Sequence, residues 1–274
     1  MNRFLLLLLL LAGSLRWAQA QRLVTQTATL AAGQRLALDL KFAHTIRVRP
    51  GAGVQVQARV TINGNQQNDL YGLTLENSAT ELRVVEQLEE EQLRQSRYTG
   101  NCDGGSFNSR SNGLNGGRGR YNYCVRIDYE VTLPAGTSLQ VTTISGDLDV
   151  SGLTGPLTAS TISGDMQLAD LTGALTVRSV SGDLKISGVR TDKLEAKSVS
   201  GDVALSWPPA LAATLRLHTV SGEVYADPAV AFSNLRPRSS VGYELHGSLG
   251  ASADSSPQVR LESVSGDVFF KVAK

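Results

Sequence analysis

The stretch Leu139-Gln-Val-Thr-Thr-Ile-Ser-Gly-Asp147 decides the fold, because five further variants of it follow in the same chain of 274 residues. The serine of the Ser-Gly-Asp element recurs at intervals of 18, 18, 19, 21 and 44 residues. A period close to 20 residues is typical of architectures in which each repeat stacks on its neighbours. The other copies are Leu157-Thr-Ala-Ser-Thr-Ile-Ser-Gly-Asp165, Leu175-Thr-Val-Arg-Ser-Val-Ser-Gly-Asp183, Leu194-Glu-Ala-Lys-Ser-Val-Ser-Gly-Asp202, Leu215-Arg-Leu-His-Thr-Val-Ser-Gly-Glu223 and Val259-Arg-Leu-Glu-Ser-Val-Ser-Gly-Asp267.

Each copy begins as a strand with one face in the core and one face in water. Positions one and three are apolar in all copies and positions two and four are polar, as Leu157-Thr-Ala-Ser160 illustrates. Such alternation is typical of a half-buried strand. Position five is always Ser or Thr, and position six is always Ile or Val. Two neighbouring residues cannot both point inward from a regular strand, so we predict a bend or bulge between positions five and six.

The glycine of each Ser-Gly-Asp element is expected to form a corner of the chain. Glycine tolerates a positive φ and the close approach of another backbone, and a second short alternating strand follows each corner. Each repeat is therefore two short strands and two corners, which must stack on its neighbours to bury its apolar face. The predicted structural corners are Gly146, Gly164, Gly182, Gly201, Gly222 and Gly266.

The sequence thus predicts an all-β protein in three parts. Residues 1–20 are expected to form a signal peptide, residues 21–136 an antiparallel β region, and residues 137–274 a short parallel β-solenoid of two-strand coils. The interval of 44 residues before the last copy is expected to hold one degenerate coil near 239–245. The N-terminal β region is expected to cap one end of the solenoid.

Residues 21–136 combine strand patterns with one long excursion. Strict alternation over 54–62 predicts a strand. Residues 86–95 fit either a short helix or a strand that ends in an acidic loop, and we favour the strand and loop because the neighbouring segments resemble strands. The stretch 94–120 is rich in Gly, Asn, Ser and Arg, so it buries too little to offset the entropy of ordering. Its arginines either are solvated or contact anionic glycans or lipid headgroups, and the candidates for such an interaction loop are Arg110, Arg118 and Arg120.

Two cysteines, Cys102 and Cys124, occur in and just after this excursion. An even pair in an exported protein is most simply a disulfide. The alternative is half of a metal site, which needs more ligands than this region offers. A bridge would staple the loop and stabilise the fold by about 3 kcal/mol through its effect on the unfolded chain.

The first 20 residues are typical of a secretory signal peptide. Arg3 precedes an apolar run over 4–15, and Ala18-Gln19-Ala20 is a small-residue cleavage pattern. We expect cleavage near Ala20, export to the periplasm, the outer surface or the medium, and no transmembrane segment in the mature chain. Removal of this segment leaves 24 basic and 25 acidic residues, a balance that argues against nucleic acid as the partner.

The acidic residue that ends each Ser-Gly-Asp element forms a row along one edge of the predicted solenoid. Either each carboxylate accepts an N–H of its turn, or the stacked oxygens bind Ca²⁺. A regular row gives its members identical environments, whereas general acid–base catalysis needs two carboxyls of unlike environment. We therefore expect no catalytic residue and no cofactor, and the candidates for Ca²⁺ are Asp147, Asp165, Asp183 and Asp202.

These motifs resemble the DUF4097-type family of exported, adhesin-like bacterial proteins. The resemblance rests on the Thr/Ser-Ile/Val-Ser-Gly-Asp rungs and on the lead-in Tyr-Glu-Val-Thr-Leu-Pro-Ala-Gly over 129–136, and it extends over 34–274. It implies a β-solenoid-like domain of the cell envelope with no catalytic motif. The cysteine-stapled loop lies outside the family pattern.

We therefore expect a non-enzymatic protein of the cell envelope or cell surface that acts as an adhesin-like interaction scaffold. Its partner is a surface glycan, a protein or another envelope component, bound by a flat solenoid face or by the basic loop. An alternative function is an envelope-stress or ligand-sensing module that acts with a membrane partner. A third is an enzyme that acts on polysaccharide.

Overall fold

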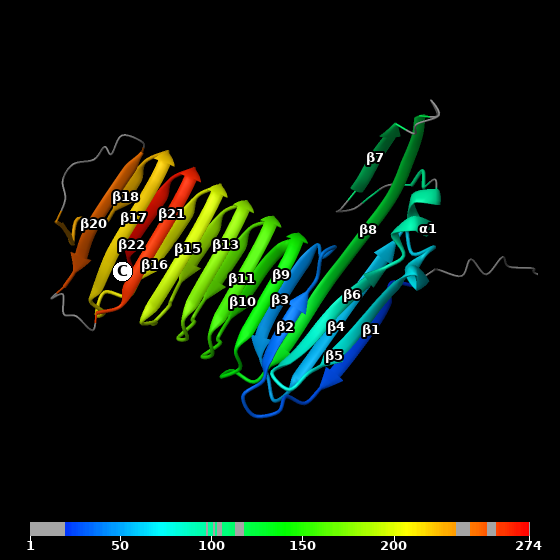
Figure 1. Ribbon diagram of the computed structural model, residues 1–274, viewed down its shortest axis with the longest axis horizontal. Coiled ribbons are helices and arrows are strands. Elements are labelled where there is room, and N and C mark those ends of the chain that lie inside the picture. The colour runs from blue at the N-terminus through cyan, green and yellow to red at the C-terminus, as the bar shows by residue number, and fades with distance from the viewer. Residues whose placement is uncertain are drawn as a thin grey trace, which may run out of the picture.

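The computed structural model describes residues 20–96, 98–100, 102, 106–112, 118–233, 242–250 and 256–273, and of 106–112 and 118–122 it describes the backbone alone. The described chain is almost entirely β, and its strands follow one another along the long axis of the molecule (Figure 1). They form two sheets of 11 strands each, here called sheet A and sheet B. No helix of the described part is long and apolar enough to cross a membrane.

The six repeats form coils of two strands, with the first strand in sheet B and the second in sheet A. Equivalent strands are parallel and in register, so that Leu157 lies between Leu139 and Leu175. The predicted parallel β-solenoid of two-strand coils is therefore confirmed. The first strands are β9 (Leu139–Ser145), β11 (Leu157–Ser163), β13 (Leu175–Ser181), β15 (Lys193–Ser200), β17 (Ala213–Ser221) and β21 (Gln258–Ser265). The second strands are β10 (Asp147–Ser151), β12 (Met166–Ala169), β14 (Leu184–Ser187), β16 (Val203–Trp207), β18 (Val224–Ala226) and β22 (Val268–Val272).

The N-terminal part continues both sheets. Strands β2 (Arg35–Asp39) and β3 (Thr45–Pro50) form one more coil, parallel to β9 and β10 respectively. Beyond this coil the pairing becomes mainly antiparallel, which confirms the predicted antiparallel β region. The remaining strands are β1 (Arg22–Ala28), β4 (Val54–Ile62), β7 (Ser106–Asn112) and β8 (Arg118–Leu133) in sheet A, and β5 (Tyr71–Asn77) and β6 (Glu81–Leu88) in sheet B.

Two short helices interrupt the N-terminal strands, η1 (Asn68–Leu70) and α1 (Glu90–Gln95). The second corrects the predicted strand and loop over 86–95, because β6 ends at Leu88 and a helix follows. Leu93 is fully buried, so the helical turn serves to place this side chain in the core. An ion pair of 3.1 Å between Arg94 and Glu90, one helical turn apart, supports the turn.

The alternation of inward and outward side chains continues through positions five and six of the repeat, so the predicted change of parity there is wrong, although the parallel pairing of the first strands skips position six. Thr161 at position five is 4% exposed, whereas Ile162 at position six is 50% exposed. Side chains at positions one, three and five therefore point inward, and those at two, four and six point outward. The prediction failed because it treated an apolar side chain as necessarily an inward one.

The last repeat in the sequence is not the last in space. Strand β21 lies between β15 and β17 and is parallel to both, and β22 lies between β16 and β18. Strands β19 (Val230–Phe232) and β20 (Tyr243–Leu249) pair antiparallel and cover the edge of β17. The predicted degenerate coil near 239–245 is thus corrected: 239–241 lie outside the described residues, and β20 is an antiparallel strand.

The glycine corners stack backbone on backbone. Gly164 has a φ of 132°, and a Cβ atom at this residue would overlap with the carbonyl oxygen of Gly146 one coil earlier. A side chain is therefore excluded both by conformation and by space. Gly222 differs, because it packs on Gly266 in the same way without a positive φ.

Candidate functional site

A row of apolar side chains crosses the outer face of sheet B. It consists of five of the six position-six residues, which are 44–50% exposed, and we call it the apolar ridge. The sixth, Val220, is half-buried. β-Branched residues suit strands in general, but Ser and Thr also occur in these strands, so strand propensity alone does not require Ile or Val in water. The ridge residues are Ile144, Ile162, Val180, Val199 and Val264.

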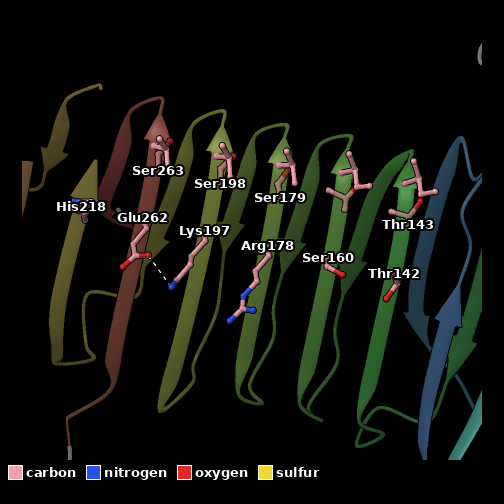
Figure 2. A pocket seen from close by; sticks show the side chains of 16 residues that line it. Thr142, Thr143, Ser160, Arg178, Ser179, Lys197, Ser198, His218, Glu262 and Ser263 are labelled. Carbon is pink, nitrogen blue, oxygen red and sulfur yellow. Dashed lines mark ion pairs between the residues drawn. The ribbon is translucent and has the colours of Figure 1, made fainter. Parts of the chain in front are cut away.

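A shallow hollow of about 740 Å³ lies along the ridge. Figure 2 shows its side chains in two rows that cross consecutive strands, one at position four and one at position five of the repeat. The position-four row changes from hydroxyls on β9 and β11 to charged groups on β13, β15 and β21. Its members are Thr142, Ser160, Arg178, Lys197, Glu262 and His218.

The hydroxyls at position five hold the corners of the coils. Thr143 Oγ1 donates a hydrogen bond of 2.8 Å to the carbonyl oxygen of Ser145, and Ser263 Oγ donates one of 2.9 Å to that of Gly201. All six hydroxyl residues are buried, at 4% exposure or less. Five of them donate to a corner carbonyl, and Ser179 is the exception. The outward contact chemistry of this face therefore lies in positions two, four and six.

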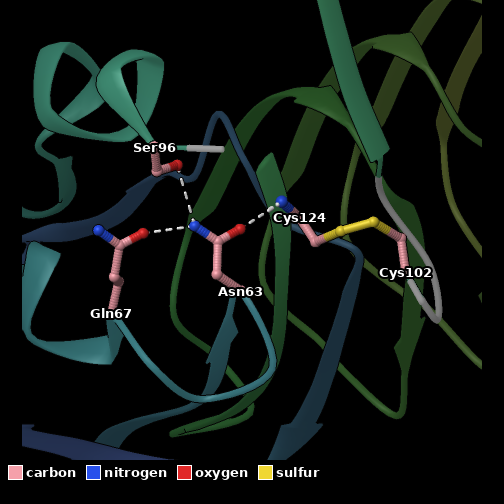
Figure 3. The surroundings of a disulfide bond; sticks show 5 residues. All are labelled: Asn63, Gln67, Ser96, Cys102 and Cys124. Atoms are coloured by element: carbon pink, nitrogen blue, oxygen red, sulfur yellow. Dashed lines mark hydrogen bonds between the residues drawn. A yellow bond between two sulfur atoms is a disulfide. The ribbon is translucent and has the colours of Figure 1, made fainter. Parts of the chain in front are cut away.

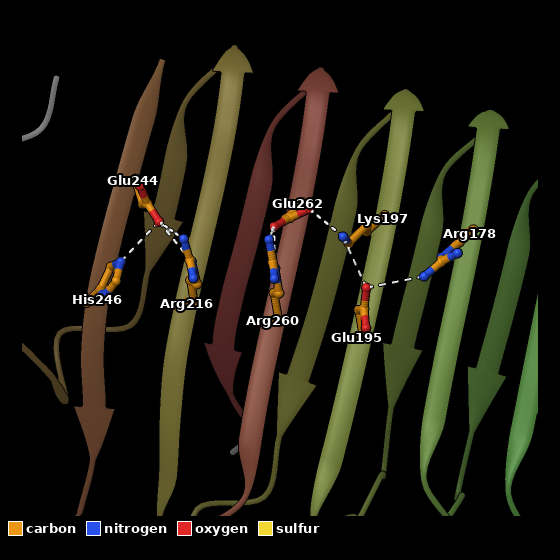
Figure 4. A network of polar contacts seen from close by, with 8 residues as sticks. All are labelled: Arg178, Glu195, Lys197, Arg216, Glu244, His246, Arg260 and Glu262. Carbon is orange, nitrogen blue, oxygen red and sulfur yellow. Dashed lines mark hydrogen bonds and ion pairs between the residues drawn. The ribbon is translucent and has the colours of Figure 1, made fainter. Parts of the chain in front are cut away.

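A ladder of ion pairs borders the hollow (Figure 4). Lys197 Nζ lies 3.1 Å from Glu195 Oε1 and 3.0 Å from Glu262 Oε2. Arg178 also pairs with Glu195, and Arg260 with Glu262. The hydrogen bond from Lys197 holds the pKa of Glu195 below its usual value. Burial raises the pKa of Glu262, but hydrogen bonds from Lys197 and Arg260 outweigh it and the net shift is downward.

These pairs leave the outer face of sheet B nearly neutral, since each carboxylate is ionised at neutral pH and lies between cations. Exposed pairs of this kind contribute only about 0–1 kcal/mol each to stability. A second group on the neighbouring strands has the same character, with Glu244 between Arg216 and His246. The ladder therefore supplies a fixed pattern of polar groups beside the apolar ridge.

The acidic row connects successive coils. Asp165 accepts the backbone N–H of Asp183 at 2.9 Å, and Asp183 accepts that of Asp202 at 2.9 Å. The amide belongs to the neighbouring coil and not to the same turn. Within the described residues no three His, Cys, Asp or Glu side chains gather closely enough to hold a metal ion. Calcium binding by Asp147, Asp165, Asp183 and Asp202 stays a prediction.

The disulfide between Cys102 and Cys124 is formed, with 5.6 Å between the two Cα atoms. Figure 3 shows that Asn63 lies against it: its Oδ1 atom accepts the N–H of Cys124 at 2.8 Å, and its Nδ2 atom donates to Ser96 and Gln67. The bridge joins Cys102 to β8, and the hydrogen bond from Cys124 to Asn63 ties this point to the turn after β4. The proposed contact residues Arg110, Arg118 and Arg120 lie in β7 and β8, and their side chains lie outside the described part of the chain.

A polar cluster between the N-terminal ends of the sheets could not be found from the sequence. Tyr129 on β8 bonds Glu86 on β6 at 2.8 Å and Tyr71 on β5 at 2.9 Å. The second carboxylate oxygen of Glu86 accepts the N–H of Phe42 at 2.7 Å. Burial raises the pKa of Glu86 to about 7. The cluster joins sheet A to sheet B, and its residues carry no common sequence signal because they come from three distant strands.

The fold and this face define the class of protein: an all-β solenoid of two-strand coils with an exposed apolar ridge. The chain belongs to the Toastrack DUF4097 family, whose model matches residues 126–271. This assignment confirms the resemblance based on the Ser-Gly-Asp rungs.

Two solved structures are similar to this chain at low sequence identity. One is a putative cell adhesion protein from Clostridium sporogenes, with 13% identity, a TM-score of 0.47, and coverage of 93% of this chain and 100% of the other. Another is a putative adhesin from Parabacteroides distasonis, with 10% identity, a TM-score of 0.29, and coverage of 93% and 98%. No curated protein matches the chain.

Proposed function

We propose that this protein is an exported, non-enzymatic binding protein of the cell envelope or cell surface, and that the outer face of sheet B is its contact face. The observation that carries this proposal is the apolar ridge, in which five β-branched side chains are about half exposed on consecutive strands of a rigid sheet. Exposed apolar patches rimmed by polar groups are typical of contact surfaces. Here the ion-pair ladder forms that rim.

The size of the ridge suggests a weak single contact. Complete burial of one Val or Ile side chain is worth about 1.5–3 kcal/mol, so covering five half-exposed ones stabilises a complex by on the order of 5 kcal/mol before the costs of association. A single contact of this strength is transient. Several copies on one surface gain avidity, which suits an adhesive or scaffolding role.

The acidic row favours a binding function over catalysis. Asp165, Asp183 and Asp202 have the same surroundings, and each accepts a backbone N–H from the next coil. Hydrolysis of a glycan uses two carboxyl groups with different environments on either side of a cleft. Glu86 has a distinct environment, but its carboxylate is taken up by Tyr129 and Phe42 in the N-terminal core.

Paired variants of the two outward positions test the contact face. Ile162→Thr with Val180→Thr keeps the β-branched shape of the side chains and removes the apolar ridge at its centre. Thr158→Ser with Thr176→Ser changes the same two strands on the same face, away from the ridge, and serves as the control. Labelled protein is measured for retention on intact bacterial cells and on a glycan array.

We expect the ridge variant to lose most of the retention and the control to keep it, with equal unfolding temperatures. Equal retention of the ridge variant and the natural protein would refute the proposed contact face. Sedimentation of the same variants shows whether the ridge instead joins two copies of the chain.

A further inference from the structure

Two aromatic rings stack on the outer face of sheet A, near its C-terminal edge. Phe269 on β22 and Tyr225 on β18 have ring centroids 4.9 Å apart and planes inclined by 6°. They are direct partners on neighbouring parallel strands. The stack therefore advances by one strand spacing, about 4.8 Å, per ring.

The next position in this row carries only a methyl group. Ala204 on β16 is the direct partner of Phe269 on the other side, and Lys185 on β14 is the next residue in the row. A hollow of about 340 Å³ lies above Ala204, and the ring of Phe269 forms one of its walls. Ala204 alone separates the ring of Phe269 from Lys185 in this row. The space above Ala204 can therefore hold one more ring stacked on Phe269.

The rim of this hollow is basic and hydroxylic. Lys185 and Lys271 line it, together with Ser187 and Ser206. Lys271 Nζ lies 5.6 Å from the centroid of the Phe269 ring. Neither lysine forms an ion pair with a carboxylate among the described residues, whereas the cations around the hollow on sheet B are largely paired.

The acidic row determines where an anion can lie. Asp183 and Asp202 precede Lys185 and Ala204 by two residues and so begin the same outward rows. They repel an anion at that end of the strands. The favourable position for a negative charge is therefore the other end of the hollow, beside Lys271 and Ser206, which are direct partners across β22 and β16.

We propose that this hollow binds a pyranose ring that carries a carboxylate, as found in glycans that contain uronic acids. The C–H face of the sugar packs on Phe269, the carboxylate lies at Lys271, and the ring hydroxyls bond Ser206 and Ser187. A benzene ring from a peptide would fill the same space but offer no hydrogen-bonding group to Ser206 or Ser187, whereas the hydroxyls of a sugar can bond both, which favours the sugar. The site lies on the opposite sheet from the apolar ridge and does not depend on it.

Calorimetric titration of the purified protein with trigalacturonic acid tests this proposal. The neutral trisaccharide of galactose is the control for charge, and the peptide Asp-Phe-Asp is the control for ligand class. The decisive variant is Ala204→Phe, which fills the hollow with the missing ring on a half-buried outer position and leaves the core unchanged. Lys271→Gln removes the charge, and Phe269→Leu removes the ring and keeps an apolar side chain.

We expect trigalacturonic acid to bind, and the neutral sugar to bind at least about tenfold more weakly, a difference set by the charge. Each of the three variants should weaken binding by about tenfold or more at an unchanged unfolding temperature, while Ile162→Thr with Val180→Thr keeps the affinity. The proposal is overturned if trigalacturonic acid does not bind, if Ala204→Phe binds it as well as the natural protein, or if the peptide binds more tightly.

Discussion

The backbone N–H of Asp183 donates a hydrogen bond of 2.9 Å to the Oδ1 atom of Asp165, one coil earlier. The most visible acid of each repeat is thus an acceptor that ties neighbouring coils together. A side chain that carries the same oxygen without the charge can replace it, whereas one without the oxygen cannot.

The first prediction follows from this bond. Asp165→Ala should lower the free energy of unfolding by about 1 kcal/mol, because the N–H of Asp183 loses its acceptor. Asp165→Asn should leave stability almost unchanged, since the amide oxygen can accept the same bond. Urea unfolding of both variants measures the difference, and equal losses would show that the charge matters and not the acceptor. If the row served this bond alone, neither Ca²⁺ nor EDTA would shift the melting temperature of the natural protein.

The second prediction concerns the corner glycines. Gly164→Ala should destabilise the protein by about 2 kcal/mol or more, because the new Cβ atom overlaps with the carbonyl oxygen of Gly146 and φ is positive. Gly33→Ala separates the two causes, since Gly33 has a φ of 83° and nothing within 4 Å of the added atom. Gly53→Ala, with open space and no positive φ, is the neutral control. In thermal unfolding, the decrease in melting temperature should be largest for Gly164→Ala, smaller for Gly33→Ala and smallest for Gly53→Ala.

The third prediction is a dependence of stability on pH through Glu86. Its pKa is raised from 4.5 to about 7, so the folded state holds this proton more tightly than the unfolded state. The contribution is therefore fully present below pH 4.5, is lost as pH rises through 7, and amounts to on the order of 3 kcal/mol. Glu86→Gln mimics the protonated acid, because its amide can donate to Tyr129 and its oxygen can accept from Phe42.

Denaturant unfolding at a series of pH values measures this effect as the difference between the two proteins. The variant should equal the natural protein near pH 4.5 and exceed it in stability at pH 8. A constant difference across the range would show that Glu86 does not titrate between these values. The comparison also removes the contribution of Glu195 and Glu262, whose pKa values are lowered and whose effects appear below pH 4.5.

The fourth prediction uses the buried hydroxyl column. Ser179 Oγ is buried and has no hydrogen-bond partner among the described residues. Ser179→Ala should therefore stabilise the protein or leave it unchanged, within about 1 kcal/mol, since it removes an unpaired polar atom from the core. Thr161 is the matched case, because its Oγ1 donates to the carbonyl oxygen of Ser163 at 3.1 Å. Thr161→Val keeps the shape and should cost about 1 kcal/mol, and the opposite signs can be read from melting temperatures.

The repeat in the sequence was sufficient to predict the parallel solenoid, because register follows directly from six copies with the same alternation. The repeat was insufficient to predict the apolar ridge. Ile162 and its equivalents are apolar, and only the structure shows that the alternation of side chains continues past Thr161 and turns them toward water. The prediction took polar side chains to face water and apolar ones to face the core. Positions five and six do the opposite, because the hydroxyl residue is buried and the Ile or Val is exposed.

Other features depend on contacts that no local pattern encodes. Glu86 and Tyr129 meet across the two sheets although 43 residues separate them in the chain. The hollow over Ala204 arises because its neighbours in space are Lys185 and Phe269, and Phe269 follows 65 positions later in the sequence. The sequence does not predict that the last repeat lies beside the fourth. All repeats have the same alternation and register, so any two of them could pair equally well.

The placement of β21 and β22 has a consequence for the order in which the coils can form during synthesis. These strands follow all the others in the sequence, yet they lie between coils that are synthesised before them. A chain that emerges from its N-terminus can stack its coils one after another only as far as β16. The coil of β17 and β18 must then stay unpaired on this side or pair with the wrong strands, because its native neighbours β21 and β22 have not yet been synthesised. Completion of both sheets is therefore coupled to delivery of residues 258–272, and a chain halted before this point has four unsatisfied strand edges, on β15 and β17 in sheet B and on β16 and β18 in sheet A.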